Sequence, residues 1–161
     1  MAVTQQLARL TDQQLADSAT DSTILDRICA GTELPDKDYG DLDWAPSLLD
    51  KAAVRAGLDP LQTEALRKST DGAAEAHPGY IGDYSMYETP TYLSSLETSE
   101  VSALLDSIDP SVLLASDVVE EVVKGVAIIE PRDYLVDQFE KLRDFYRESA
   151  NRGLAVLLWW D

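Results

Sequence analysis

Side chains suited to nucleophilic or metal chemistry are scarce in this sequence. The chain of 161 residues has one histidine, His77, and one cysteine, Cys29. A structural zinc site needs four Cys or His ligands, and one cysteine with one histidine cannot supply them. A nucleophilic triad would have to use His77 as its base. No GxSxG turn accompanies it, and because it directly precedes Pro78-Gly79 we expect it in a surface loop. We therefore assign no catalytic residue and predict no metal or cofactor, while the question of enzyme activity stays open.

Carboxylates are abundant, but their spacing matches no known site. Asp36, Asp38, Asp41 and Asp43 resemble the start of a calcium loop, yet the central glycine is missing and Ser47 stands where a bidentate glutamate is required. Neither GxxxxGK(S/T) nor GxGxxG occurs, so nucleotide binding through those phosphate loops is excluded.

One segment gathers side chains suited to recognition. Residues 71–90 lose all periodicity, and an irregular stretch of ~20 residues is unusual unless it packs on its own contacts or serves a site. Tyrosine offers apolar area with a polar tip. We predict a ligand or partner patch at His77, Tyr80, Asp83, Tyr84, Tyr87 and Tyr92. The alternative is a loop that its tyrosines attach to the core.

Net charge narrows the choice of partner. The formal charge is −17, from 30 acidic and 13 basic residues, which disfavours nucleic acid and anionic membranes and favours a basic protein. Between Ile81 and Glu130 there is a single base, Lys124, so we expect this region to supply a binding face. Its acids are Asp83, Glu88, Glu97, Glu100, Asp106, Asp109, Asp117, Glu120, Glu121 and Glu130.

The elements that must position these residues indicate an α+β fold: one helix-rich domain over 1–161, packed on a small mixed sheet. Residues 2–10 could be a short strand, and a helix is predicted from Asp12 to Ala30. Pro46 and Pro60 each open a helix, and Pro131 begins the clearest one, with a stripe of large apolar residues. The apolar run 154–160 fits a strand buried on both faces. Residues 91–96 form a candidate strand before a helix capped by Thr98 or Ser99, and Asp109-Pro110 starts another helix.

Localisation is expected to be cytoplasmic. No stretch reaches the ~20 apolar residues that cross a bilayer, and the first residues do not resemble a signal peptide. One cysteine cannot form an internal disulfide, and we expect Cys29 to be a buried thiol on a helix. The oligomeric state is left open.

Two segments resemble the YfbM-like bacterial proteins, a family of unknown function. They are PTYLSSLETSEVSALLDSID and EKLRDFYRESANRGLAVLLWWD. Shared features are a strand-to-helix step at Tyr92, Leu93, Glu100 and Val101 and a helix-to-strand step at Leu142, Arg143, Phe145, Tyr146, Ala150 and Gly153. Asp43-Trp44 before a helix is a further point of similarity. The serines at 94 and 95 lengthen the first step, and the N-terminal segment matches weakly. The resemblance implies a small α+β fold in a bacterial cytoplasm, and it carries over no catalytic residue.

Two functions of different classes remain. The first is a non-enzymatic acidic interaction protein that engages a basic partner protein; neutralisation of a basic toxin is one concrete form. The second is a small-molecule-binding domain or enzyme with a pocket bordered by residues 77–92.

Overall fold

A five-stranded sheet forms the centre of the protein. The computed structural model describes residues 3–86 and 88–161. The described strands lie in the order β2-β1-β5-β4-β3, and each neighbouring pair among them is antiparallel. Their bounds are β1 Gln5–Leu10, β2 Tyr39–Asp41, β3 Ala74–Glu75, β4 Thr91–Leu93 and β5 Ala155–Trp160.

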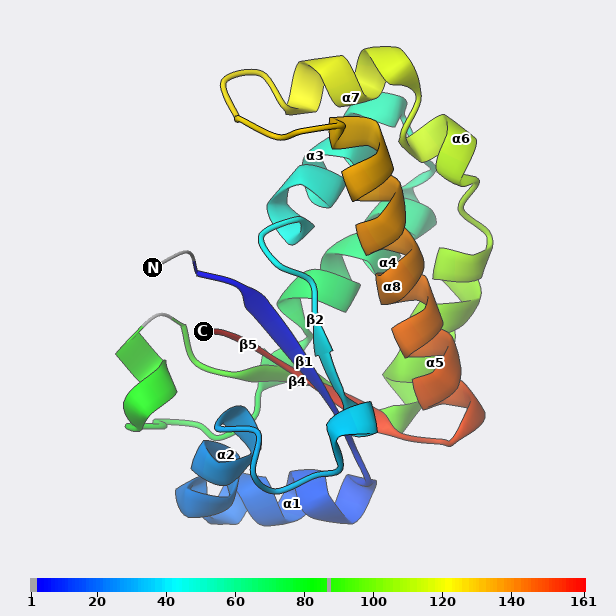
Figure 1. Cartoon of the computed structure of the whole chain (residues 1–161). Coiled ribbons are helices and arrows are strands. Elements are labelled where there is room, and N and C mark those ends of the chain that lie inside the picture. The colour runs from blue at the N-terminus through cyan, green and yellow to red at the C-terminus, as the bar shows by residue number, and fades with distance from the viewer. Residues whose placement is uncertain (1–2, 87) are drawn as a thin grey trace.

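Helices cover the two faces of the sheet unequally. Figure 1 shows α1 and α2 below the sheet and the longer helices on its other side. The helices are α1 Asp12–Thr20, α2 Ser22–Cys29, α3 Pro46–Ala56, α4 Pro60–Asp71, α5 Ser95–Asp106, α6 Pro110–Leu113, α7 Ser116–Val122 and α8 Pro131–Asn151. Short 3₁₀ turns lie at Asp36–Asp38 and Asp83–Met86. In the described part of the chain, none of the helices is long and apolar enough to cross a membrane.

Strand β5 contributes to both halves of the core. Val156 and Leu158 pack with α3, α5 and α8, whereas Leu157 and Trp159 pack with α2 on the opposite face. This follows from the alternation of side chains along a strand, which requires an apolar residue at every position when both faces are covered. The predicted C-terminal strand is confirmed, and so is the predicted burial of Cys29, which lies in the smaller cluster.

The expected α+β class is confirmed, with three local differences. The sheet is antiparallel in its described pairs rather than mixed, because both neighbours of β5 run opposite to it. The predicted helix over residues 12–30 is broken at Asp21, whose side chain accepts a hydrogen bond from the Thr23 backbone N–H and thereby starts a second helix. Helix α5 begins before Thr98, because Ser94 and Glu97 form a reciprocal capping box.

Three other elements satisfy the last carbonyl groups of α4. Tyr146 Oη of α8 donates to the Ser69 carbonyl at 2.9 Å, and Thr91 Oγ1 at the start of β4 donates to the Asp71 carbonyl at 2.8 Å. Between them, Gln5 Nε2 of β1 donates to the Thr70 carbonyl. The final carbonyls of a helix lack partners within the helix, so these bonds join the end of α4 to the sheet and to α8.

Candidate functional site

An apolar groove lies between α7 and the first turn of α8. Its volume is about 440 Å³. Val119, Val123 and Pro131 form the apolar part of its lining, and the remaining lining residues are Ser116, Glu120, Glu130, Arg132 and Asp133. The segment that joins α7 to α8 adds exposed apolar side chains, since Ile129 is 90% exposed and Val126 38%. Apolar side chains are therefore accessible from solvent along one edge of the molecule.

The rim of this groove is acidic. Glu120, Glu130 and Asp133 are exposed and form no ion pair with any other described residue. The one cation in the lining, Arg132, donates from Nε to the Leu114 carbonyl at 3.1 Å, which fixes part of its guanidinium against the chain. A negative rim around an apolar floor is complementary to a ligand that carries both positive charge and hydrocarbon.

Glu130 holds an uncommon backbone conformation at the edge of the groove. Its φ is 49° and its ψ 59°, the left-handed region that favours glycine, and it occupies the N-cap position of α8 without a capping side-chain hydrogen bond. Such a conformation costs a non-glycine residue on the order of 1 kcal/mol. The side chain of Glu130 makes no described contact that offsets this cost.

The acids of residues 81–130 do not form one face. Several of them serve the fold: Asp109 caps α6, Asp106 pairs with Arg147, and Glu121 pairs with Lys124. Glu97 belongs to the capping box of α5. Only part of the expected acidic region, chiefly Glu120 and Glu130, therefore contributes to the groove.

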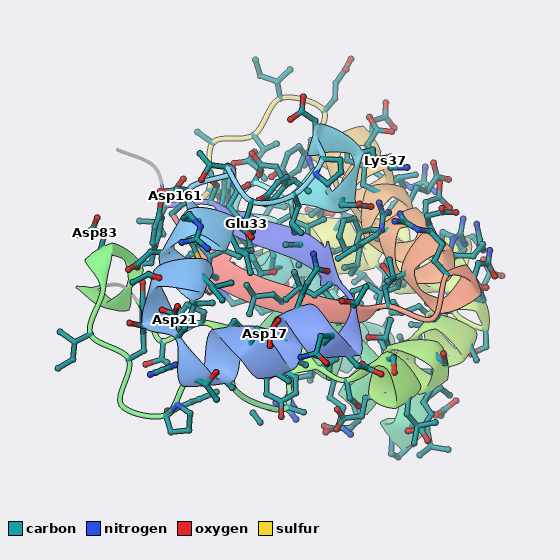
Figure 2. The ribbon with its side chains drawn as sticks, turned by 90° about the horizontal axis from the view of Figure 1, so that it is seen from below. Asp17, Asp21, Glu33, Lys37, Asp83 and Asp161 are labelled. Carbon is teal, nitrogen blue, oxygen red and sulfur yellow. The ribbon has the colours of Figure 1, made fainter. Side chains whose placement is uncertain are left out.

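A second acidic surface covers α1 and α2. Figure 2 shows Asp17, Asp21 and Asp83 on this side, and Glu33 near its centre. Asp21 caps α2 and Glu33 pairs with Arg27 at 2.7 Å. The hydrogen bond to Thr23 lowers the pKa of Asp21. Local hydrogen bonds and ion pairs thus engage more of the acids on this face than on the groove rim.

Two residues of the predicted patch pack against the helices below the sheet. His77 is half-buried, with Nδ1 3.0 Å from the Ser18 carbonyl, and its ring centroid lies 6.4 Å from that of Tyr80. Tyr80 is 5% exposed, and its hydroxyl donates to the Asp26 carboxylate. Burial raises the pKa of Tyr80, which keeps its hydroxyl protonated as a donor. These two side chains attach the segment to the helices below the sheet.

The other patch residues point to different places. Tyr84 and Tyr92 are half-buried and pack at the edge of the smaller core cluster, while Asp83 is exposed. Tyr92 also lines a shallow groove of about 360 Å³ against α1, together with Pro78 and Glu75. Tyr87 lies outside the described residues. The structure therefore brings His77 and Tyr80 together, and it does not gather the described patch around one pocket.

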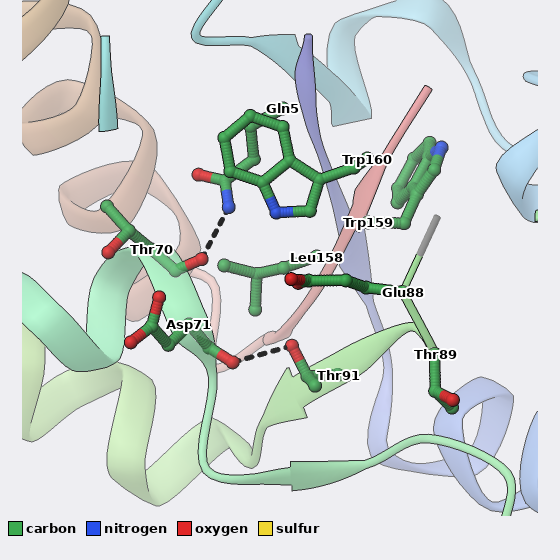
Figure 3. Close-up of a pocket in the computed structure, with 9 residues that line it drawn as sticks. All are labelled: Gln5, Thr70, Asp71, Glu88, Thr89, Thr91, Leu158, Trp159 and Trp160. Atoms are coloured by element: carbon green, nitrogen blue, oxygen red, sulfur yellow. Dashed lines mark hydrogen bonds between the residues drawn. The ribbon is translucent and has the colours of Figure 1, made fainter. Parts of the chain in front are cut away.

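A pocket that the sequence did not reveal lies where β5 ends beside the end of α4. Its volume is about 230 Å³, and its lining residues, drawn in Figure 3, are Gln5, Thr70, Asp71, Glu88, Thr89, Thr91, Leu158, Trp159 and Trp160. Trp160 lies on the same face of β5 as Leu158, while Trp159 points to the other face. No spacing signal marks this pocket, because it is assembled from the ends of elements far apart in the sequence.

Two further features bear on chemistry, namely the grouping of candidate metal ligands and the environment of the Cys29 thiol. The described residues contain no group of three or more His, Cys, Asp or Glu side chains that could hold a metal ion. Cys29 is buried, and desolvation raises the pKa of its thiol, which disfavours the reactive thiolate.

Together these features define an α+β protein with an antiparallel sheet, one large helical layer and one small one. Among solved structures, the chain is similar to YfbM from Escherichia coli, a protein of unknown function. The TM-score is 0.67 at 16% sequence identity, over 98% of this chain and 99% of that one. The chain thus has the YfbM-like fold that the sequence resemblance implied, and a likeness at this identity extends to the fold alone. No protein-family model matches the sequence, and the search of curated proteins found no match.

Proposed function

We propose that this chain is a non-enzymatic interaction protein whose groove between α7 and α8 engages a basic partner protein. The observation that carries the proposal is the groove itself, in which an apolar floor is bordered by three acids without ion pairs, Glu120, Glu130 and Asp133. The overall charge of −17 adds long-range attraction for a positively charged partner. We expect this binding to take place in a bacterial cytoplasm, where the buried Cys29 stays reduced.

The groove also indicates which part of a partner it fits. Val119 of α7 and Val123, the residue that follows this helix, lie one turn apart, and Pro131 lines the groove from the start of α8. A cavity of about 440 Å³ has room for one or two large apolar side chains. The expected partner segment therefore carries one or two large apolar residues flanked by Lys or Arg, since lysine and arginine would reach the acidic rim.

The proposal is tested with a double variant, Glu120→Gln with Glu130→Gln. Partners are captured from bacterial extract at about 0.05 M and 0.5 M salt, where the Debye length falls from roughly 14 Å to 4 Å. At low salt we expect the unaltered chain to capture basic proteins, and at high salt we expect these proteins to be released. The double variant should bind them about tenfold more weakly, because each exposed charge contributes on the order of 0.5–1 kcal/mol to binding.

A control variant with the same change in net charge separates the groove from general electrostatic attraction. Asp36→Asn with Glu100→Gln removes two exposed acids that form no ion pair with other described residues and lie on other elements. The control should retain the captured proteins. If both double variants lose them equally, or if the captured proteins are neither basic nor sensitive to salt, the groove is not the binding site.

Direct mapping with a defined peptide provides a second measurement. A synthetic peptide of alternating lysine and leucine is titrated into the isotopically labelled protein, and backbone amide shifts are followed by NMR. The largest changes are expected at Val119, Val123 and Glu130. Changes confined to α1 and α2 would assign the interaction to the other acidic face instead.

A further inference from the structure

The pocket drawn in Figure 3 is separate from the groove and has its own chemistry. It is formed by the end of α4, the end of β5 and residues 88–91, whereas the groove lies on α7 and α8. A volume of about 230 Å³ is below the ~300–1,000 Å³ that accommodates drug-sized molecules, so a ligand of a few non-hydrogen atoms is the appropriate size.

The charged groups of this pocket are carboxylates, with no cation in the lining. Asp71 and Glu88 contribute carboxylates, Thr70, Thr89 and Thr91 contribute oxygens, and the lining contains no lysine, arginine or histidine. Asp71 pairs with Arg67 at 3.3 Å, while Glu88 forms no ion pair with another described residue. The lining therefore attracts positive charge and repels anions.

A buried amide forms part of the pocket wall. Gln5 is 1% exposed, and its Nε2 donates to the Thr70 carbonyl, while its Oε1 has no hydrogen-bond partner among the described residues.

The aromatic ring of Trp160 favours a cation. The indole of Trp160 lies beside Gln5 and on the same side of the strand as Leu158, and Figure 3 shows the Glu88 side chain directed toward it. The face of an indole attracts cations within ~6 Å.

We propose that this pocket binds a small organic cation, namely a primary alkylammonium ion. Its ammonium group donates hydrogen bonds to the Glu88 carboxylate, and its hydrocarbon chain packs on Leu158 and the indole of Trp160. Binding here is independent of the protein partner proposed for the groove. It also narrows the expectation of a ligand pocket along residues 77–92 to the end of that segment, at Glu88, Thr89 and Thr91.

The test compares three probes of equal size and different charge. n-Butylammonium, n-butanol and butyrate are titrated separately into the whole protein, and the indole N–H and backbone amide signals are followed by NMR. We expect saturable shifts at Trp160, Thr91 and Thr70 with butylammonium and weak, unsaturated shifts with the other two probes. Equal responses to butanol and butylammonium, or a response confined to α7 and α8, would overturn the proposal.

Matched variants locate the contact. Glu88→Gln removes an exposed carboxylate, leaves the core untouched and should weaken butylammonium binding about fivefold. Glu100→Gln makes the same change on α5 and should leave the affinity as it is. Trp160→Leu keeps an apolar side chain, removes the ring and should weaken binding two- to fivefold. An affinity that is the same in Glu88→Gln as in the unaltered protein refutes the assignment, whatever Trp160→Leu does to folding.

Discussion

The hydroxyl of Tyr146 donates a hydrogen bond of 2.9 Å to the backbone carbonyl of Ser69, although the two residues are 77 positions apart. Both are fully buried. The bond satisfies a carbonyl in the last turn of α4 and fixes that helix against α8. The end of α4 also borders the pocket beside Trp160, so this contact helps to position a candidate site.

Replacement of Tyr146 by phenylalanine is predicted to destabilise the protein by about 1–2 kcal/mol. The ring would still fill its place in the core, while the Ser69 carbonyl would be buried without a donor. Equilibrium urea unfolding measures the change. Tyr84→Phe offers a control, because its half-buried ring lies at the edge of the smaller cluster and its hydroxyl makes no hydrogen bond with another described residue. Equal stability of Tyr146→Phe and the unaltered protein would show that the carbonyl finds another donor.

Asp38→Asn is predicted to lower the free energy of unfolding at pH 7 by roughly 2 kcal/mol. The Asp38 carboxylate is buried and lies 2.5 Å from Arg152 Nη1 and 3.8 Å from Arg9 Nη1. The substitution would leave both guanidinium groups without this carboxylate.

The same variant gives a pH dependence whose sign is fixed by the pKa. The hydrogen bond from Arg152 holds the pKa of Asp38 below its ordinary value, so the stabilisation is complete above the unfolded pKa of about 4. It is lost as the pH falls through the lower, folded-state pKa. Urea unfolding between pH 7 and pH 2 should show the difference between the two proteins shrinking below pH 4, and a difference that stays constant would contradict the ion pair.

Asp50→Asn is predicted to stabilise the protein at neutral pH. Desolvation raises the pKa of Asp50 to about 6, and one carboxylate oxygen has no described partner while the other accepts from Thr70 at 3.3 Å. A raised carboxyl pKa means that ionisation disfavours the folded state, so this group's contribution falls as the pH rises from about 4 to 6.

The amide of asparagine cannot ionise and can still accept from Thr70. The gain over the unaltered protein should therefore be negligible at pH 4 and reach on the order of 2 kcal/mol at pH 7. Thermal or urea unfolding at both pH values measures it. A variant that is less stable than the unaltered protein at pH 7 would show that the charge of Asp50 is needed.

Glu130→Gly is predicted to separate stability from binding. Glycine adopts the left-handed conformation without strain, so the variant should gain about 0.5–1 kcal/mol in the free energy of unfolding. The variant also removes one acid from the groove rim, so its affinity for the captured basic partner should fall several-fold. Stability is measured by urea unfolding and affinity by titration. Gains in both properties would remove Glu130 from the proposed interface.

Several elements could be predicted because their signals are local. The stripe on α8 and the prolines at residues 46, 60 and 131 mark helices whose start or face depends only on neighbours in sequence. The break at Asp21 was missed because an aspartate that caps α2 looks like the interior of one long helix. The start of α5 could have been read from Ser94 and Glu97, which have the spacing of a capping box.

The candidate sites could not be predicted in the same way. Glu88 and Trp160 are 72 positions apart in the printed sequence and meet only because β4 pairs with β5. Likewise, the sequence contains every acid of residues 81–130 but does not show which ones find partners. Asp106 is paired by Arg147 from a distant part of α8, whereas Glu120 is left exposed at the groove.

Taken alone, the amino-acid order determined the α+β class, the buried C-terminal strand and the negative charge, because hydrophobic periodicity and composition act over short ranges. Tertiary structure decided the antiparallel pairing, the pocket beside Trp160 and which carboxylates remain available to a partner. Those features depend on the packing of segments that are far apart along the chain, and no local pattern records how such segments meet.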